Sequence, residues 1–234
     1  MGAANTNGKK ALVRQMFSDL APDYDRLNRI ISFNSDRRWR RRAVGPLFDC
    51  KTVVDLCAGT GDMALALLTN PEFEGMAVLS DFALPMLKLA KKKLERFQGR
   101  AFLVCADAEK LPFKAGVFDG ATLGFSLRNL ENLSVFAAEA RRVLKTGGAG
   151  SFLEIAHPSN GVWGKLFYTY FYQLMPKMAG LFTRHRQAYR YLPESLKVFP
   201  RQSEVSALFL RESFSESRYE NLWGGLAAIY KVRK

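Results

Sequence analysis

The chain has 234 residues, of which 48% are hydrophobic and 24% are charged. These values are typical of a globular protein and exclude a disordered, fibrous or low-complexity chain. The formal net charge of +13 favours an anionic partner, either nucleic acid or an anionic membrane face. The cysteines, Cys50, Cys57 and Cys105, have no metal-ligand spacing, so we expect no metal site, and we expect Cys57 and Cys105 to be reduced thiols in the core.

The first part of the chain is predicted to be helical. We expect two or three helices over residues 9–43, with breaks near Pro22 and residues 32–35. Residues 37–42 read Arg-Arg-Trp-Arg-Arg-Arg, and a tryptophan among arginines is typical of a lipid head-group interface or the edge of a binding cleft. A solvated basic surface is the alternative interpretation of this run.

Residues 53–62 form the most informative segment, Val-Val-Asp-Leu-Cys-Ala-Gly-Thr-Gly-Asp. A predicted strand over residues 52–57 ends in a tight glycine loop, which opens into a predicted helix over residues 62–70. This pattern is the nucleotide-binding turn of a Rossmann-like sheet, in which glycines allow the backbone to approach a ligand. The loop alone leaves a nicotinamide dinucleotide and S-adenosylmethionine (SAM) both open.

The remaining elements alternate between strands and helices, which indicates a parallel sheet with right-handed crossovers. We predict strands at 76–80, 101–105, 118–125 and 149–155, helices at 83–97, 131–144 and 201–211, and a final antiparallel pair at 214–219 and 222–232. The aromatic stretch within residues 158–199 is interrupted by charges and Pro176, so we expect an inserted lid or interfacial helix rather than a membrane span.

Acidic residues near the predicted strand ends favour SAM over a dinucleotide. Asp81 ends the second strand, about 20 residues beyond the glycine loop, where a carboxylate binds ribose hydroxyls. Asp107 follows the third strand, and Asp119 lies at the fourth. Carboxylates at successive strands suit a ligand that carries an amine, a ribose diol and an adenine amine. We therefore expect SAM as the cofactor and methyl donor.

Several motifs then resemble one family along nearly the whole chain, the ubiquinone/menaquinone biosynthesis C-methyltransferases. The matching motifs are Phe17-x-x-x-Ala21-x-x-Tyr24-Asp25-x-x-Asn28, Val54-Asp55-Leu-x-x-Gly59-Thr60-Gly61-Asp62, Asp107-Ala108-Glu-x-Leu-Pro-Phe113, Leu127-Arg128-Asn129 and Tyr191-Leu-x-Glu194-Ser195. The glycine loop is shared by most SAM enzymes, whereas the last two motifs are much more specific. Residues 184–187, Tyr230 and His157 depart from the family pattern, and we expect these sites to line or border the substrate side.

The resemblance implies an α/β, Rossmann-like class I SAM-dependent methyltransferase fold with a mostly parallel seven-stranded sheet and an antiparallel last strand. It implies a single domain over 1–234, with an N-terminal helical cap (9–45) and the inserted lid (158–199). The cofactor-binding residues that it implies are Asp55, Gly59, Thr60, Gly61, Asp81, Phe82, Asp107, Ala108 and Phe125. For the substrate it implies Tyr24, Arg128 and Tyr191.

The reaction implied by the resemblance transfers a methyl group from SAM to a ring carbon of a polyprenylated hydroquinone. A guanidinium cannot act as a base at neutral pH, so we interpret Arg128 as an electrostatic stabiliser of the phenolate. Its alternative role is an ion pair with Glu131 or Glu154. Asn129 is predicted to orient a ring oxygen, with a helix N-cap as the alternative. His185 is a candidate proton acceptor, or a part of a basic lid.

The expected partners are a polyprenyl quinol substrate, with demethylmenaquinol slightly preferred, and an anionic membrane surface. No signal or transit pattern and no nucleic-acid-binding signature are found, so we expect a cytoplasmic protein at the inner membrane face, without nucleic acid. The sequence leaves open whether the chain forms a homodimer. Methylation of a soluble phenol and a non-catalytic SAM-binding scaffold are the alternative functions.

Overall fold

The computed structural model describes residues 6–158, 161–174 and 186–234. Three helices precede the sheet, α1 (Thr6–Leu20), α2 (Tyr24–Ile31) and α3 (Ser35–Val44). They match the helical cap that the sequence predicts. The buried face of α3 includes two charged residues, Asp36 and Arg40, beside Ala43 and Val44. The other arginines of this helix are exposed to solvent.

The sheet has seven strands in the order β3-β2-β1-β4-β5-β7-β6. They are β1 (Thr52–Leu56), β2 (Met76–Asp81), β3 (Ala101–Cys105), β4 (Phe118–Gly124), β5 (Leu144–Ile155), β6 (Glu216–Leu222) and β7 (Ala227–Arg233). β1 to β5 pair in parallel, whereas β7 is antiparallel to both β5 and β6. The predicted mostly parallel sheet is thereby confirmed.

Two strand starts, those of β5 and β7, differ from the prediction by five residues. The strand predicted at 222–232 is interrupted, because Leu222 ends β6 and a short turn (Trp223–Gly225) precedes β7. Gly224 and Gly225 reverse the chain there with φ angles of 67° and 95°. β5 also begins five residues earlier than predicted, at Leu144 rather than residue 149, with a register shift opposite residues 118–120.

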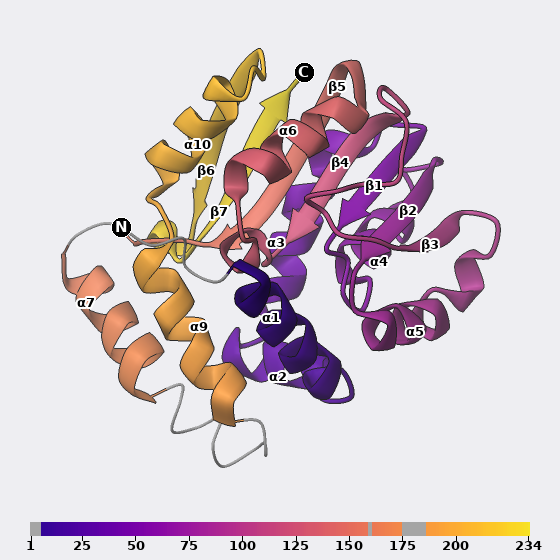
Figure 1. The fold of residues 1–234 in the computed structure, drawn as a ribbon. Helices are drawn as coiled ribbons and strands as arrows, with labels where there is room; N and C mark the ends of the chain where they lie inside the picture. The colour runs from indigo at the N-terminus through magenta and orange to yellow at the C-terminus, as the bar shows by residue number, and fades with distance from the viewer. Residues whose placement is uncertain (1–5, 159–160, 175–185) are drawn as a thin grey trace.

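Helices cover both faces of the sheet and form two cores (Figure 1). α6 (Leu133–Val143) and α10 (Gln202–Arg211) pack on one face, where Phe136, Phe152 and Phe209 are almost completely buried. α3, α4 (Asp62–Leu68) and α5 (Leu84–Lys93) pack on the other. Burial of these apolar side chains on both faces supplies the main stabilisation of the sheet.

The described part of the lid is helical, as the sequence predicts. It consists of α7 (Val162–Thr169), a π-helical turn (Tyr170–Leu174) and α9 (Arg186–Val198). In Figure 1 these helices lie with α1 and α2 beyond the carboxyl ends of the central strands. The hydroxyl of Tyr170 donates to the carbonyl oxygen of Ile31 at 2.9 Å, which ties the lid to the end of α2. His185 lies outside the described residues.

Candidate active site

Two adjoining cavities lie between the carboxyl ends of the strands, the N-terminal cap and the lid. The larger has a volume of about 340 Å3, and the smaller lies beside the glycine loop. Phe17, Tyr24 and Asn129 line both of them. In open α/β sheets, ligands bind in the crevice outside the carboxyl ends of the strands, so both cavities occupy the expected place.

The smaller cavity is built on the glycine loop. Gly59 has a φ of 55° and lines the cavity, and its N–H donates to Oδ2 of Asp81 at 2.8 Å. The N–H of Ala83 donates to Oδ1 of the same carboxylate at 2.8 Å. Burial raises the pKa of Asp81, although these two backbone bonds oppose the rise. Asp81 therefore holds the loop after β1 against the end of β2.

Asp55 lies beneath this loop and lines neither cavity. Its side chain is 1% exposed, and Oδ2 accepts a hydrogen bond from the N–H of Ala64 at 3.1 Å. Oδ1 has no hydrogen-bond partner among the described residues. Burial raises the pKa of Asp55 to about 7. The carboxylate thus anchors the first turn of α4.

Thr60 and Gly61 also line neither of the two cavities. The Thr60 hydroxyl donates to Asp25 at 2.5 Å and accepts from Lys93 at 3.0 Å. Gly61 is the N-cap of α4 with a φ of 81°, and a Cβ there would lie 3.0 Å from Leu79. Both residues shape the loop and the helix start without lining the cavities.

The far end of the smaller cavity carries an acidic cluster with a lysine inside it. Phe82, Asp107 and Ala108 line this end. Nζ of Lys10, on α1, lies 2.9 Å from Asp107 and 2.7 Å from Glu109. Burial lowers the pKa of Lys10, but the hydrogen bonds and charges of the two carboxylates more than reverse this and raise it. The carboxylates of this cluster therefore accept N–H donors.

Asp119 does not belong to this site, so the expectation for the fourth strand is wrong. It lies near the start of β4, where Oδ2 accepts from the Thr52 N–H at 2.9 Å and Oδ1 pairs with Lys145 at 2.7 Å. Thr52 begins β1, so these groups occupy the amino edge of the sheet. The carboxyl end of β4 instead supplies Gly124 and Phe125.

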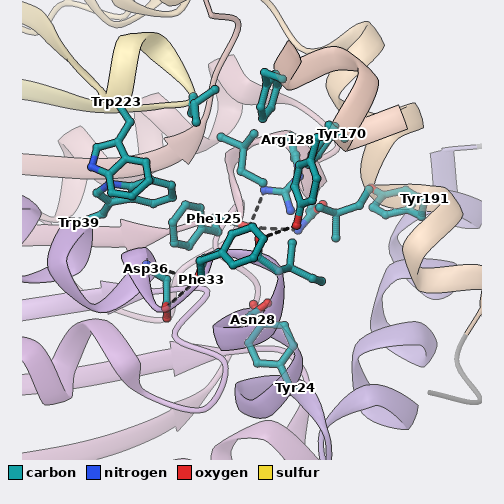
Figure 2. Close-up of a pocket in the computed structure, with 18 of the residues that line it drawn as sticks. Tyr24, Asn28, Phe33, Asp36, Trp39, Phe125, Arg128, Tyr170, Tyr191 and Trp223 are labelled. Atoms are coloured by element: carbon teal, nitrogen blue, oxygen red, sulfur yellow. Dashed lines mark hydrogen bonds between the residues drawn. The ribbon is translucent and has the colours of Figure 1, made fainter. Parts of the chain in front are cut away.

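The larger cavity is lined mostly by aromatic and aliphatic side chains (Figure 2). Its rings include Phe33, Trp39, Phe125, Phe167, Tyr170 and Trp223. Trp39 packs edge-on against Trp223, with ring centroids 5.7 Å apart. Phe33 is 68% exposed and Trp223 is 51% exposed. The cavity therefore accommodates an apolar, planar ligand and has exposed rings at its edge.

Arg128 lines this cavity and is also ion-paired. Its backbone N–H donates to Oε2 of Glu154 at 3.0 Å, and its guanidinium pairs with the other oxygen and donates to the Phe125 carbonyl. Glu154 is fully buried. The alternative ion pair with Glu154 is thus observed together with the cavity position, whereas Glu131 lies near Lys10 instead.

Three polar side chains that line the cavities, Asn129, Tyr191 and Tyr24, have unpaired polar atoms or raised pKa values. Oδ1 of Asn129 and the hydroxyl of Tyr191 are buried without a partner among the described residues. The N-cap alternative for Asn129 is wrong, since Asn132 caps α6. Burial raises the pKa of Tyr24 and of Tyr191, so both hydroxyls are neutral at pH 7. Such unpaired groups are typical of a ligand site.

Backbone strain marks the ends of the two central strands. Cys57, just after β1, has a φ of 51°, and Phe125, just after β4, has a φ of 63°. Residues other than glycine rarely adopt this region, which costs about 1–3 kcal/mol each. Cys57 lines the smaller cavity and Phe125 the larger. The strain therefore lies where the chain turns out of the sheet into the site.

Asp36 and Arg40 are the main residues that the sequence analysis missed. Asp36 lines the larger cavity and Arg40 the smaller, and they are 3% and 5% exposed. The Arg40 guanidinium lies 4.9 Å from the centre of the Phe125 ring, and Nε lies 3.9 Å from Asp62. The spacing of four residues between an acid and an arginine was the available signal.

Tyr230 and His157, two of the positions that depart from the family pattern, line neither cavity, contrary to expectation. Tyr230 is fully buried in β7 and packs against Phe209, with centroids 6.5 Å apart. Nε2 of His157 donates to the Phe199 carbonyl oxygen at 2.8 Å and so fixes the chain beside α9. Neither residue lines either cavity.

The residues of the smaller cavity fit SAM. Gly59 has the positive φ that favours glycine, and a Cβ at Gly124, the last residue of β4, would lie 2.6 Å from the Arg40 side chain, so glycine suits both positions of the cavity wall. The acidic end accepts an amine, as the bonds of Lys10 demonstrate. Asn129 and Glu131, which line this cavity, also have buried oxygens without a hydrogen-bond partner among the described residues.

The sheet order and this site define a Rossmann-like SAM-dependent methyltransferase. A solved SAM-dependent methyltransferase from Thermotoga maritima has the same fold, with a TM-score of 0.69 at 17% identity over 95% of this chain and 99% of that chain. Human N-acetylserotonin methyltransferase in complex with SAM has a TM-score of 0.60 at 15% identity over 86% of this chain and 52% of that chain.

Sequence comparison identifies the family more narrowly. The chain belongs to the ubiE/COQ5 methyltransferase family, whose profile matches residues 5–234. It is 42% identical to demethylmenaquinone methyltransferase of Thermus thermophilus over 218 residues, which cover 92% of this chain and 98% of that protein. It is 37% identical to a ubiquinone/menaquinone biosynthesis C-methyltransferase of Geobacter over 98% of both chains. The chain is therefore an enzyme that uses SAM as methyl donor.

Proposed function

We propose that the enzyme methylates a ring carbon of a polyprenylated hydroquinone, with demethylmenaquinol preferred over the benzoquinol precursor. The observation that carries this proposal is the aromatic cavity of about 340 Å3 adjoining the SAM cavity through Tyr24 and Asn129. An apolar cavity of this kind suits a fused ring better than a charged metabolite. The names of the relatives support the same reaction.

Residues of the smaller cavity would hold SAM. Asp81 would bind the ribose hydroxyls, and Asp107 with Ala108 would bind the adenine. Gly59 and the strained Cys57 would bring the backbone close to the ligand. When bound, SAM supplies a methyl group on a positively charged sulfur, which a carbon nucleophile can attack.

Residues of the larger cavity would activate the ring. A ring carbon becomes a strong nucleophile when a neighbouring hydroxyl is deprotonated. Arg128 would stabilise the resulting phenolate, and Glu154 fixes its guanidinium in position. Asn129 and Tyr191 would orient a ring oxygen through their unpaired polar atoms. The aromatic walls would exclude water and hold the ring in line for transfer.

We also infer peripheral contact with an anionic membrane through the edge of the larger cavity. Phe33, Leu166 and Trp223 are 68%, 59% and 51% exposed and line this cavity. Arg37 and Arg41 are exposed on α3, which begins two residues after Phe33. Among the described residues, no helix is long and apolar enough to cross a membrane. Aromatic rings beside arginines suit an interfacial position, from which a polyprenyl substrate would enter.

The substrate assignment is tested by a competition assay. Purified enzyme, SAM and a strong reductant are mixed with short-tailed demethylmenaquinol and the benzoquinol precursor, and products are followed by mass spectrometry. The proposal predicts a mass gain of one methyl group, mainly on the naphthoquinol. A soluble phenol methylated in preference to both quinols would refute it, and SAM binding without any methylated product would favour a scaffold role.

The membrane contact is tested by flotation with liposomes that contain anionic lipid. Phe33→Ser with Leu166→Ser should reduce the bound fraction, whereas Leu210→Ser, an exposed leucine on α10, should not. Salt should weaken the binding of all variants because arginines contribute. Equal binding of the double variant and the control would contradict this contact surface.

A further inference from the structure

The proposed reaction needs a group that accepts the hydroxyl proton of the quinol. Arg128 remains protonated at neutral pH and is paired with Glu154. Burial raises the pKa of Tyr24 and Tyr191, so neither is an anion at pH 7. Glu154 itself is fully buried and occupied by bonds to Arg128. Among the residues that the structure describes, the acceptor must therefore be sought elsewhere on the cavity wall.

Asp36 is the one carboxylate among the described residues that line the larger cavity. It lies in the first turn of α3, the helix that also carries Trp39 (Figure 2). The hydroxyl of Ser32 donates to Oδ1 at 2.9 Å and so fixes the orientation of the carboxylate. An oriented carboxylate in an otherwise apolar wall is well placed to act on a bound hydroxyl group.

The second oxygen of Asp36 is available to a ligand. Oδ2 lies 3.8 Å from Nε of Arg40, beyond hydrogen-bond distance, and no hydrogen bond reaches it from the described residues. Nε of Arg40 is likewise buried without a hydrogen-bond partner. Nε of Arg40 also lies 3.9 Å from Asp62, so the positive charge of Arg40 interacts with two carboxylates. Asp36 and Arg40 therefore form an ion pair without a hydrogen bond, and Oδ2 remains free to accept a proton.

We propose that Asp36 is the general base that takes the hydroxyl proton of the quinol, an inference that rests on the proposed function. The O–H bond breaks, the proton goes to Oδ2, and the oxygen keeps the electron pair. Charge then moves to the adjacent ring carbon, which forms the new bond to the methyl group as the sulfur takes up the electron pair of the broken S–C bond. The ring carbon loses its hydrogen to water as a proton, and Asp36 returns its own proton to the oxygen. Each turnover thus releases one proton to solvent.

The experiment compares two substrates of different acidity. Single-turnover rates are measured for the wild type, Asp36→Asn and Asp36→Glu with demethylmenaquinol and with a naphthalenediol analogue whose electron-withdrawing substituent makes its hydroxyl group more acidic. Asp23→Asn is the matched control, because Asp23 lies on the same helical cap and lines neither cavity. SAM affinity is measured by calorimetry for each variant.

Removal of the base should lower the rate with demethylmenaquinol by about 10²-fold or more, with SAM affinity unchanged. With the acidic analogue the loss should shrink to less than about 10-fold, because that hydroxyl loses its proton more readily. If Asp36→Asn does not fold, Asp36→Glu is used instead, because it keeps the negative charge opposite Arg40. Its rate loss with demethylmenaquinol is then compared with its rate loss with the acidic analogue. Equal losses on both substrates, or a rate within about threefold of wild type for Asp36→Asn, would overturn the inference. Failure of the wild type to methylate the quinol would refute the proposed function instead.

Discussion

The pH dependence of stability should reveal the buried carboxylate under the glycine loop. Asp55 is 1% exposed, and burial raises its pKa to about 7 from the ordinary value of 3.8. The folded protein therefore binds a proton there that the unfolded chain releases at a lower pH. This contribution to stability is fully present below about pH 4 and is lost as the pH rises through about 7. Asp55→Asn removes the titration but keeps an oxygen that can accept the Ala64 N–H.

The size of the effect follows from the pKa difference. A shift of about three units corresponds to about 4 kcal/mol, an upper bound for one buried group. We therefore expect the stability of the wild type to fall relative to Asp55→Asn by up to about 4 kcal/mol between pH 4 and pH 8. Urea unfolding at several pH values measures both free energies. The new amide hydrogens add a cost that does not vary with pH, so only the change with pH is interpreted.

A second carboxylate provides the control. Burial alone would raise the pKa of Asp119, but hydrogen bonds from Lys145 and Thr52 lower it below its usual value. Asp119 is then ionised in both the folded and unfolded states above about pH 5, so Asp119→Asn should give a constant difference from pH 5 to 8. A constant difference for Asp55→Asn over the same range would refute the account of Asp55. It would indicate that water or a local opening reaches the carboxylate.

Three further predictions concern other contacts. Lys10→Met should tighten SAM binding by about fivefold, measured by calorimetry, because it frees Asp107 and removes a positive charge near a cationic ligand; weaker binding would contradict this. Glu154→Ala should destabilise the fold by about 3–5 kcal/mol in urea unfolding because it leaves Arg128 buried and unpaired, and a loss under about 1 kcal/mol would count against the pair. Gly75→Ala would place a methyl group 2.6 Å from a backbone oxygen and should cost about 1–3 kcal/mol, while an unchanged melting temperature would show that the backbone adapts.

The sheet and the glycine loop could be predicted because they are local patterns. Each short apolar run that we predicted as a strand corresponds to a strand of the sheet. The loop at Gly59 and Gly61 has the positive φ angles that its glycines suggest. Asp81 was found at the end of β2 because a strand end is visible in the hydrophobic pattern. The seven strands, mostly parallel with an antiparallel last strand, followed from the resemblance and are confirmed by the sheet.

Contacts between distant elements could not be predicted. Lys10 reaches Asp107 across 97 residues, and no spacing rule connects α1 with the turn after β3. Asp119 was misplaced because the hydrophobic run of β4 does not reveal which of its ends faces the ligand. Tyr230 was expected beside the substrate, whereas the pleat of β7 turns it into the core.

The arginine run illustrates why a cluster of like charges hides individual roles. Four of the arginines between residues 37 and 42 are exposed, as a solvated or membrane-facing surface requires. Arg40 is buried instead, because the helix period aligns it with Asp36, Ala43 and Val44. Only the periodicity within the run, and not its charge, could have separated Arg40 from its neighbours.

The position of the transferred methyl group shows whether the enzyme methylates carbon or oxygen. The enzyme is incubated with demethylmenaquinol, a reductant and SAM labelled with carbon-13 in its methyl group, and the product is examined by carbon NMR. We expect a labelled methyl group bonded to a ring carbon, with the chemical shift of an aryl methyl. A label in a methoxy group, or no label in the quinol, would contradict C-methylation by this chain.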